Sequence, residues 1–198
     1  MKCLYCDKTI DNISLKSVFL KEDDLCPDCR GGLKVSRRII QVEEMKVEVF
    51  YEYDGLFKSL LLQYKECLDE ALKDVLLYEI SDYINLRYMG YMICFVPSSK
   101  KKLEYRGFEH LKLIFEEVRL PELKGLSMKE ELCQEGMDLL QKRKMISNFV
   151  YNGKHTDRVL LVDDVLTSGS TLLGAYRALS TGCKRVKVLS LAYKNNLH

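Results

Sequence analysis

The segment that most constrains the fold covers residues 159–172 and reads VLLVDDVLTSGSTL. Its first four residues are apolar and predict a strand covered on both faces, as in a parallel sheet with helices above and below it. Asp163 and Asp164 come where we expect this strand to end. Because successive strand residues point to opposite faces, at most one of these carboxylates faces straight into a site while the other braces it. Small polar residues follow at 167–171, and the apolar spacing beyond them predicts a helix that begins at this loop.

The loop at residues 167–171 has the composition of a phosphate-binding site. The free N–H groups and positive dipole end of a helix attract an anion, and glycine with short hydroxyl side chains lets a phosphate approach the backbone. No lysine follows Gly169, which excludes the GxxxxGK(S/T) loop of nucleoside triphosphatases, and no GxGxxG turn is present for a dinucleotide. A ribose 5-phosphate, with its phosphate on the loop and its hydroxyls on Asp163 and Asp164, fits this pattern. The alternative is a capped helix after a strand, with both aspartates as solvated turn residues.

Two acids followed by this loop resemble the phosphoribosyl diphosphate (PRPP) motif of type I phosphoribosyltransferases. By that resemblance Asp163 and Asp164 would hold the ribose hydroxyls. The residues that would wrap the 5-phosphate are Thr167, Ser168, Gly169, Ser170 and Thr171.

Four cysteines near the start of the chain have the spacing of metal ligands. Cys3, Cys6, Cys26 and Cys29 form two CxxC pairs separated by nineteen residues. Each CxxC turn can point both sulfurs at one ion, and two such turns complete the tetrahedral thiolate shell of structural Zn²⁺. Disulfides or a redox CxxC are the alternatives. The chain carries no secretory signal and its other cysteines are scattered, so we expect a reducing, cytoplasmic setting and a zinc ribbon.

Length and charge set the domain organisation. The 198 residues suffice for one α/β core plus the metal-binding segment. We therefore expect a four-cysteine module at residues 1–40 and a phosphoribosyltransferase-like domain at 41–198. The formal net charge of +2 gives no overall basic field that would indicate nucleic acid or membrane partners. The longest uncharged hydrophobic stretch, residues 88–96, is much shorter than the roughly 20 residues of a membrane helix, so we expect no membrane span.

The hydrophobic patterns predict strands that alternate with helices. Residues 30–41 read as a basic connector and 46–53 as an edge strand or hairpin. Further strands are expected at 91–96, 148–151 and 185–193, helices at 56–64, 68–86 and 107–118, and a short strand followed by a helix at 126–141. This alternation predicts a parallel sheet with flanking helices, whose ligand lies beyond the carboxyl ends of the strands.

Pro97, Ser98 and Ser99 directly follow the strand expected at 91–96. They should therefore share a rim with Asp163 and the 167–171 loop. Serine hydroxyls, exposed backbone N–H groups and the positive run at 100–102 suit a diphosphate with its Mg²⁺. An ordinary surface turn is the alternative.

The order of these parts resembles the ComF family, late competence proteins with an amino-terminal zinc module and a PRPP-binding domain. The resemblance spans nearly the whole chain. Beyond the cysteines and the acidic loop, the matching residues are Tyr53-Asp54, Gln63-Tyr64-Lys65, Pro97, Tyr105-Arg106-Gly107-Phe108, Gln134 and Arg143. The chain departs from the family at residues 106–110, which read RGFEH where RGFNQ is usual, and around residues 143–148, where RxxN is altered. Ser168 stands where threonine is common.

The resemblance implies a Mg²⁺-dependent phosphoribosyltransferase in which a nitrogen nucleophile displaces diphosphate from PRPP. Arg106 and Lys65 would stabilise the charge on the leaving diphosphate, and one of the two aspartates would lie beside the ribose as it becomes cationic. A solvated cation at a helix end is the alternative for Arg106 and Lys65. No histidine is assigned as a base, although His110 falls in a segment that can face the cleft.

Family membership also implies a part in DNA uptake during transformation, and two further function classes stay open. One is a module that binds single-stranded DNA through the zinc ribbon, the cations at 34–38 and 100–102, and some of the twelve tyrosines. The other is a non-catalytic adaptor that senses a phosphoribosyl ligand and docks onto a competence helicase.

Overall fold

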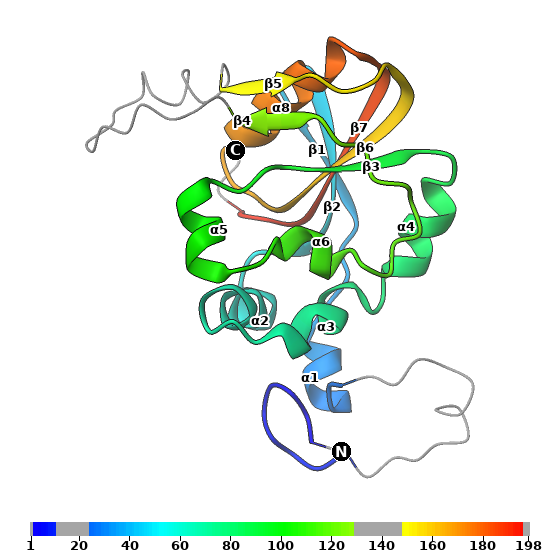
Figure 1. Cartoon of the computed structure of the whole chain (residues 1–198). Helices are drawn as coiled ribbons and strands as arrows, with labels where there is room; N and C mark the ends of the chain where they lie inside the picture. The colour runs from blue at the N-terminus through cyan, green and yellow to red at the C-terminus, as the bar shows by residue number, and fades with distance from the viewer. Residues whose placement is uncertain (1, 11–23, 129–147, 196–198) are drawn as a thin grey trace.

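The computed structural model describes residues 2–10, 24–128 and 148–195 (Figure 1). A five-stranded sheet forms its centre, with the strand order β1, β2, β7, β6, β3. The strands are β1 (Arg38–Val42), β2 (Met45–Glu52), β3 (Met92–Phe95), β6 (Thr156–Leu166) and β7 (Cys183–Tyr193). The β1–β2 pair is antiparallel and the three other pairings are parallel. A separate antiparallel pair joins β4 (Leu126–Met128) to β5 (Phe149–Tyr151).

Helices lie on both sides of this sheet. They are α1 (Pro27–Gly32), α2 (Gly55–Glu66), the 3₁₀ turn η2 (Glu70–Leu72), α3 (Lys73–Leu77), α4 (Ser81–Arg87), α5 (Lys100–Arg106), α6 (His110–Ile114) and α8 (Ser170–Ser180). In Figure 1, α8 and the β4–β5 pair lie above the sheet, and α2, α3 and α6 lie below it. The predicted α/β class, with a mainly parallel sheet and flanking helices, is confirmed. Among the described helices, none has the length and apolarity to cross a membrane.

Strand β6, an interior strand of the sheet, is the element that the sequence predicted best. Residues 159–162 are 0% exposed and pair with β3 on one side and β7 on the other. The strand extends beyond the predicted end, because its pairing with β7 continues to Leu166. Its pairing with β3 stops at Val162, however. Asp163 and Asp164 therefore lie inside β6 but past the end of its neighbour β3. On that side, β3 does not pair with this part of β6.

The hairpin expected around residues 46–53 is formed by β1 and β2, in register from Arg38 opposite Val49 to Val42 opposite Met45. Strand β2 is not at the edge, because it also pairs with β7. The edge strand is β1, which begins within the connector predicted at residues 30–41. It continues past residue 40, where the sequence predicted the end of the four-cysteine module. Four arginine and lysine residues in that connector obscured its alternation, so only the pairing with β2 identifies the strand.

Two helical predictions need correction. Residues 68–86 do not form one helical region but divide into η2, α3 and α4. The helix expected at 107–118 is confined to α6, because Gly107 adopts φ 76° and ends the preceding α5, where its N–H donates to Leu103 O at 2.8 Å. A left-handed glycine of this kind is a common helix terminator. Helix α5 itself was not predicted, since its three consecutive lysines lack apolar periodicity.

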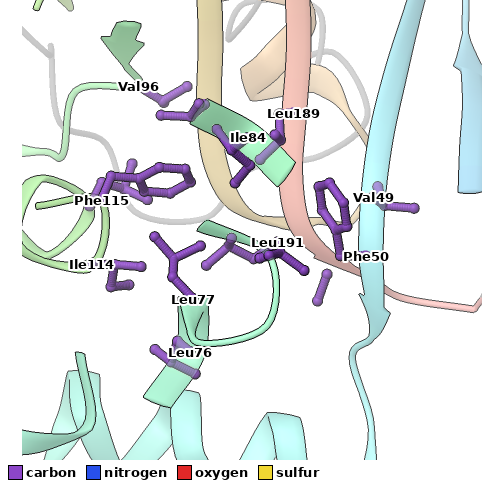
Figure 2. Packing of buried hydrophobic residues seen from close by; sticks show 14 of the residues in the cluster. Val49, Phe50, Leu76, Leu77, Ile84, Val96, Ile114, Phe115, Leu189 and Leu191 are labelled. Carbon is purple, nitrogen blue, oxygen red and sulfur yellow. The ribbon is translucent and has the colours of Figure 1, made fainter. Parts of the chain in front are cut away.

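The break between α3 and α4 lets both helices pack on the sheet. Figure 2 shows Leu77 of α3 and Ile84 of α4 meeting Leu189 and Leu191 of β7. Leu189 and Leu191 are two residues apart and so face the same side of the sheet. All four side chains are 0% exposed. Burial of a leucine or isoleucine side chain contributes about 1.5–3 kcal/mol, so this layer fixes α3 and α4 on the sheet.

The cysteine-bearing segment packs on the helical layer. Leu25 and Leu33, on either side of α1, are buried and belong to the same apolar cluster as the sheet. Arg30 of α1 donates a hydrogen bond to Val75 O of α3 at 3.4 Å. The helix expected in the second half of 126–141, together with Gln134 and Arg143, lies outside the described residues.

Candidate functional site

The carboxyl ends of β3 and β6 form one edge of the sheet, as the sequence predicted. The Val96 N–H donates to Val162 O at 3.1 Å, which continues the pairing one step past β3. Immediately beyond this bond, Pro97 to Ser99 follow strand β3, and Asp163 and Asp164 lie in the adjacent part of strand β6. The structure thus brings the two predicted PRPP-binding segments side by side.

The turn from β6 to α8 depends on Gly169, which adopts φ 74° directly before the helix. A Cβ at this position would lie 2.7 Å from Val42 Cγ1, so only glycine fits the turn. Thr167 and Ser168 are exposed, and Ser168 Oγ lies 3.1 Å from Ser170 Oγ. Three hydroxyl side chains therefore surround the first turn of α8, whose N–H groups have no partners within the helix. This is the local geometry of an anion site.

Asp164 is the centre of a buried polar cluster. Its Oδ2 contacts Lys65 Nζ and lies 2.7 Å from His110 Nε2. The three side chains come from β6, the last turn of α2 and the start of α6, and each is at most 14% exposed. Three elements far apart in the sequence are thus tied together at this carboxylate.

The charges of the cluster follow from these contacts. Burial alone would raise the pKa of Asp164, but the adjacent Lys65 ammonium and the His110 hydrogen bond outweigh burial and hold the pKa well below its usual range. Burial lowers the pKa of His110; the hydrogen bond and charge of Asp164 oppose this, and the Lys65 and Arg106 charges reinforce it. The His110–Asp164 contact is therefore a hydrogen bond from a neutral imidazole, and Lys65 supplies the counter-charge to the carboxylate.

Arg106, the last residue of α5, lies beside the same histidine. Its Nη1 is 3.4 Å from His110 Nδ1, and its Nη2 is 3.3 Å from Glu66 Oε1. The arginine side chain is 9% exposed, and its Nε–H finds no hydrogen-bond partner among the described residues. A buried guanidinium N–H without a partner is costly, and an anionic ligand would satisfy it.

The three residues at 63–65, which belong to the sequence resemblance, each contact a different neighbour. Gln63 donates to Asp69 Oδ2 at 3.0 Å, Tyr64 OH donates to His110 O at 2.9 Å, and Lys65 contacts Asp164. Tyr64 thereby fixes the backbone of His110 while Lys65 fixes the acid that His110 contacts. Helix α2 therefore positions His110 and Asp164 through direct contacts.

Four of the predicted site residues lie in the cluster around His110 and Asp164. Arg106 and Asp164 contact His110, Ser98 Oγ lies 3.4 Å from His110 Nδ1, and Lys65 contacts Asp164. Asp163 is half-buried, and its Oδ1 accepts a hydrogen bond from the Asp164 N–H at 2.9 Å. The run at 100–102 begins α5 instead of forming a loop.

His110 is the residue that sequence reasoning left without a role. The available signal was the replacement in the RGFEH segment, where a histidine stands at the last position of the usual RGFNQ. Its partner Asp164 is 54 positions away, so no local pattern of residues indicates this contact.

A cavity of about 300 Å³ opens beside this cluster. Its walls come from the end of β3, the start of α6 and the segment around β4. The lining residues are Cys94, Phe95, Val96, Pro97, Ser98, Glu109, His110, Leu111, Lys112, Glu122, Leu123, Lys124, Gly125 and Leu126. Its volume is at the lower end of the range of small-molecule pockets, roughly 300–1,000 Å³.

The four predicted metal-ligating cysteines lie together at the amino-terminal end. Their Sγ atoms are all within 4.8 Å of one another, and those of Cys6 and Cys26 are 3.7 Å apart. Zn–S bonds of about 2.3 Å in a tetrahedron separate the sulfurs by about 3.8 Å, so the cluster fits Zn²⁺. The cluster could therefore bind a metal ion such as zinc.

Comparison with known proteins gives likenesses to solved structures. No family model and no curated protein matches the chain. Among solved structures, the chain is similar to a hypoxanthine phosphoribosyltransferase from Staphylococcus aureus, with a TM-score of 0.41 and 13% sequence identity. The similarity covers 64% of this chain and 66% of that enzyme, slightly under two thirds of its length.

Proposed function

We propose that the protein binds PRPP at the edge of the sheet where β3 and β6 end, and acts as a phosphoribosyltransferase-like protein. One observation carries the proposal: the strand, the two acids, the Gly169 turn and α8 follow one another, with Lys65 in contact with Asp164 and Arg106 beside His110, the other partner of Asp164. The 5-phosphate would bind at residues 167–171, the first turn of α8. Pro97, Ser98 and Ser99 would border the diphosphate.

The two aspartates would have different tasks. Asp164 Oδ2 is already engaged by Lys65 and His110, so Asp164 would hold the cations and the imidazole in place. Asp163 lies on the opposite face of the strand and is half-buried, so it would accept the ribose hydroxyls. The Arg106 guanidinium would donate to the diphosphate, because its Nε–H has no partner among the described side chains and backbone groups. These assignments support displacement of diphosphate by a nitrogen nucleophile.

Mg²⁺ would enter this site together with the diphosphate. Magnesium prefers oxygen ligands, and diphosphate oxygens would supply them, since Asp164 is engaged elsewhere. When bound, the ion neutralises the charge that grows on the leaving group. Lys65 and Arg106 would share that task from the protein side.

Thermal denaturation with PRPP and MgCl₂ tests the proposal. Ligand at a hundredfold excess over its dissociation constant stabilises the folded state by about 2.7 kcal/mol, or roughly 5–11 °C for a chain of this size. Asp163→Asn should abolish the shift. Asp157→Asn is the matched control, because Asp157 is an exposed acid on the same strand, paired with Lys184 at 2.7 Å. Absence of a shift in the wild-type protein would refute PRPP binding.

We also propose that Zn²⁺ occupies the four-cysteine cluster as a structural ion. Four thiolates complete the tetrahedral shell and leave no position for a substrate. Leu25 and Cys26 are buried against the helical layer, so the ion would fix the cysteine-bearing segment on the domain. Metal analysis of the purified protein should find zinc at one ion per chain; a clearly smaller amount would refute the site.

From the sequence resemblance we further propose a part in the uptake of transforming DNA, in the cytoplasm, with a competence helicase as a partner. Direct binding of single-stranded DNA is the alternative function. Arg37 and Arg38 in the basic segment are paired with Glu48 and Glu52, so much of that charge is already neutralised. Fluorescence anisotropy with a labelled oligonucleotide decides the alternative. Binding that weakens steeply with salt and survives Asp163→Asn would favour the DNA-binding module.

A further inference from the structure

Two cations of strand β7 lie on the face of the sheet that carries α3 and α4. Figure 2 shows Ile84 of α4 packing on Leu189 of β7. Strand residues two apart face the same side, so Arg185 and Lys187, four and two positions before Leu189, face that side as well. Leu189 is 0% exposed, whereas Arg185 and Lys187 are both exposed. The helices therefore cover the later part of β7 and leave its amino end open.

The neighbouring strands place two further cations beside these. Arg158 of β6 is the register partner of Arg185. Lys46 of β2 lies beside Lys187, because the pairing of β2 with β7 begins at the next position along both strands. Both side chains are exposed. Adjacent strands are about 4.8 Å apart, and residues two apart in one strand are about 6.6 Å apart, so the four charges are closely spaced.

Arg87, the last residue of α4, is linked to Arg158 through two tyrosine rings. The guanidinium carbon of Arg87 lies 5.7 Å from the centroid of the Tyr88 ring, and that of Arg158 lies 5.9 Å from the centroid of the Tyr91 ring. The two rings meet edge to face, with centroids 5.6 Å apart. We call the five residues of this surface the cationic row: Lys46, Arg87, Arg158, Arg185 and Lys187.

The cationic row is not neutralised within the described part of the chain, where none of its five side chains forms an ion pair. Asp157 points to the opposite face of β6 and pairs with Lys184 at 2.7 Å. Glu48, two positions after Lys46, is already bonded to an arginine and two tyrosines. A surface of one sign concentrates anions from solution, so the row favours an anionic partner.

We infer that the cationic row docks an acidic segment of another protein, one that carries aliphatic side chains among its aspartates and glutamates. Two large apolar side chains beside Arg87, those of Leu86 and Met89, are 78% and 74% exposed. A Cβ at Gly90 would lie 3.8 Å from Arg158 Nη1, so the turn after α4 borders the row. Carboxylates of the partner pair with the cations, and its aliphatic groups cover Leu86 and Met89.

A single-stranded nucleic acid fits the cationic row less well than an acidic protein segment. Its bases need aromatic faces on which to stack. Tyr88 and Tyr91 are only 3% and 9% exposed, and the guanidinium groups of Arg87 and Arg158 lie against their rings. A phosphate backbone also has no apolar groups to cover the two exposed aliphatic side chains.

The cationic row is far from the proposed PRPP site. Arg158 lies near the start of β6, and Asp163 lies five residues further along the strand, a separation of about 16 Å. An acidic segment on the row therefore leaves the PRPP site open. The inference does not depend on the proposed function.

Fluorescence anisotropy with a labelled peptide of glutamate and leucine tests the inference. Arg185→Gln combined with Lys187→Gln removes the centre of the cationic row. Lys154→Gln combined with Lys184→Gln is the matched control, because it removes the same charge at exposed positions outside the row. Wild-type protein and the control should bind the peptide equally, and the row variant should bind it roughly 2- to 30-fold more weakly, as expected for the loss of two exposed ion pairs. A peptide with glutamine in place of glutamate should not bind.

A second variant and two competing probes complete the test. Lys46→Gln combined with Arg158→Gln repeats it at other positions of the row, and circular dichroism identifies any variant that does not fold. Absence of peptide binding by wild-type protein, or equal binding by the row variants and the control, overturns the inference. Tighter binding of oligothymidylate or of phosphatidylserine vesicles, lost in the row variants, also overturns it, because the row would then bind a nucleic acid or a membrane.

Discussion

Replacing Lys65 by methionine would remove the cation from a buried ion pair while keeping a side chain of similar length. Lys65 and Asp164 are 14% and 12% exposed in this pair. Breaking a buried pair from one side costs about 3–5 kcal/mol, because the remaining charge stays buried. His110 keeps its hydrogen bond to Asp164, so we expect the lower value, about 3 kcal/mol. For a chain of this length the melting temperature should then fall by roughly 6–12 °C.

The cost of this substitution should depend on pH. In the wild-type protein the pKa of Asp164 is below its usual value, so its contribution to stability is present above the unfolded-state pKa of about 3.9. That contribution is lost as the pH falls through the lower folded-state pKa. Without Lys65, burial raises the folded-state pKa of Asp164, and protonation then relieves the variant. The difference in unfolding free energy between wild type and Lys65→Met should therefore shrink as the pH falls from 7 towards 4.

Urea unfolding followed by circular dichroism at several pH values measures this difference. Lys58→Met is the control, because Lys58 lies on the same helix and is exposed; its effect should stay within about 0.5 kcal/mol. Adding Asp164→Asn to Lys65→Met should recover most of the lost stability, since the unpaired charge is then absent. A loss below about 1 kcal/mol at pH 7, or a difference that grows as the pH falls, would refute the assignment of a buried ion pair.

Three further perturbations address other parts of the molecule. Gly169→Ala should destabilise the protein by about 1–2 kcal/mol, because its φ of 74° and the approach to Val42 both oppose a Cβ; Gly31→Ala, where no atom lies within 4 Å of the added Cβ, should cause no loss in a melting experiment. Removing metal with a chelator should lower the melting temperature and expose the thiols of the four-cysteine cluster to a colorimetric reagent, and unchanged thiol reactivity would contradict a metal centre. Burial alone would raise the pKa of Glu48, but hydrogen bonds from two tyrosines and Arg37 outweigh it and hold the pKa below its usual value. The wild-type protein should therefore lose stability as the pH falls below about 4.3, while Glu48→Gln, already less stable at pH 7, should show a flatter pH profile in urea unfolding.

Local signals were sufficient to predict strand β6 and the helix after it. Four apolar residues at 159–162 and the helical spacing after Gly169 each reflect contacts within one element, so the sequence predicted both. The predictions failed where a neighbour decides the structure. Strand β1 exists because β2 pairs with it, and residues 68–86 are broken because α3 and α4 must both reach β7. Helix α5 has no apolar face in its first turn to reveal it.

The amino-acid sequence alone determined which functional groups this protein carries: two acids before a phosphate-sized loop, and two CxxC turns with metal-ligand spacing. These motifs are local features of the sequence, because a loop or a turn is built from adjacent residues. Only the tertiary structure decided which partners those groups have. It joined Asp164 to Lys65 and His110 and placed His110 in the wall of a cavity. The choice depends on contacts across 54 or more positions, which the packing of helices on the sheet fixes and which no local pattern of residues records.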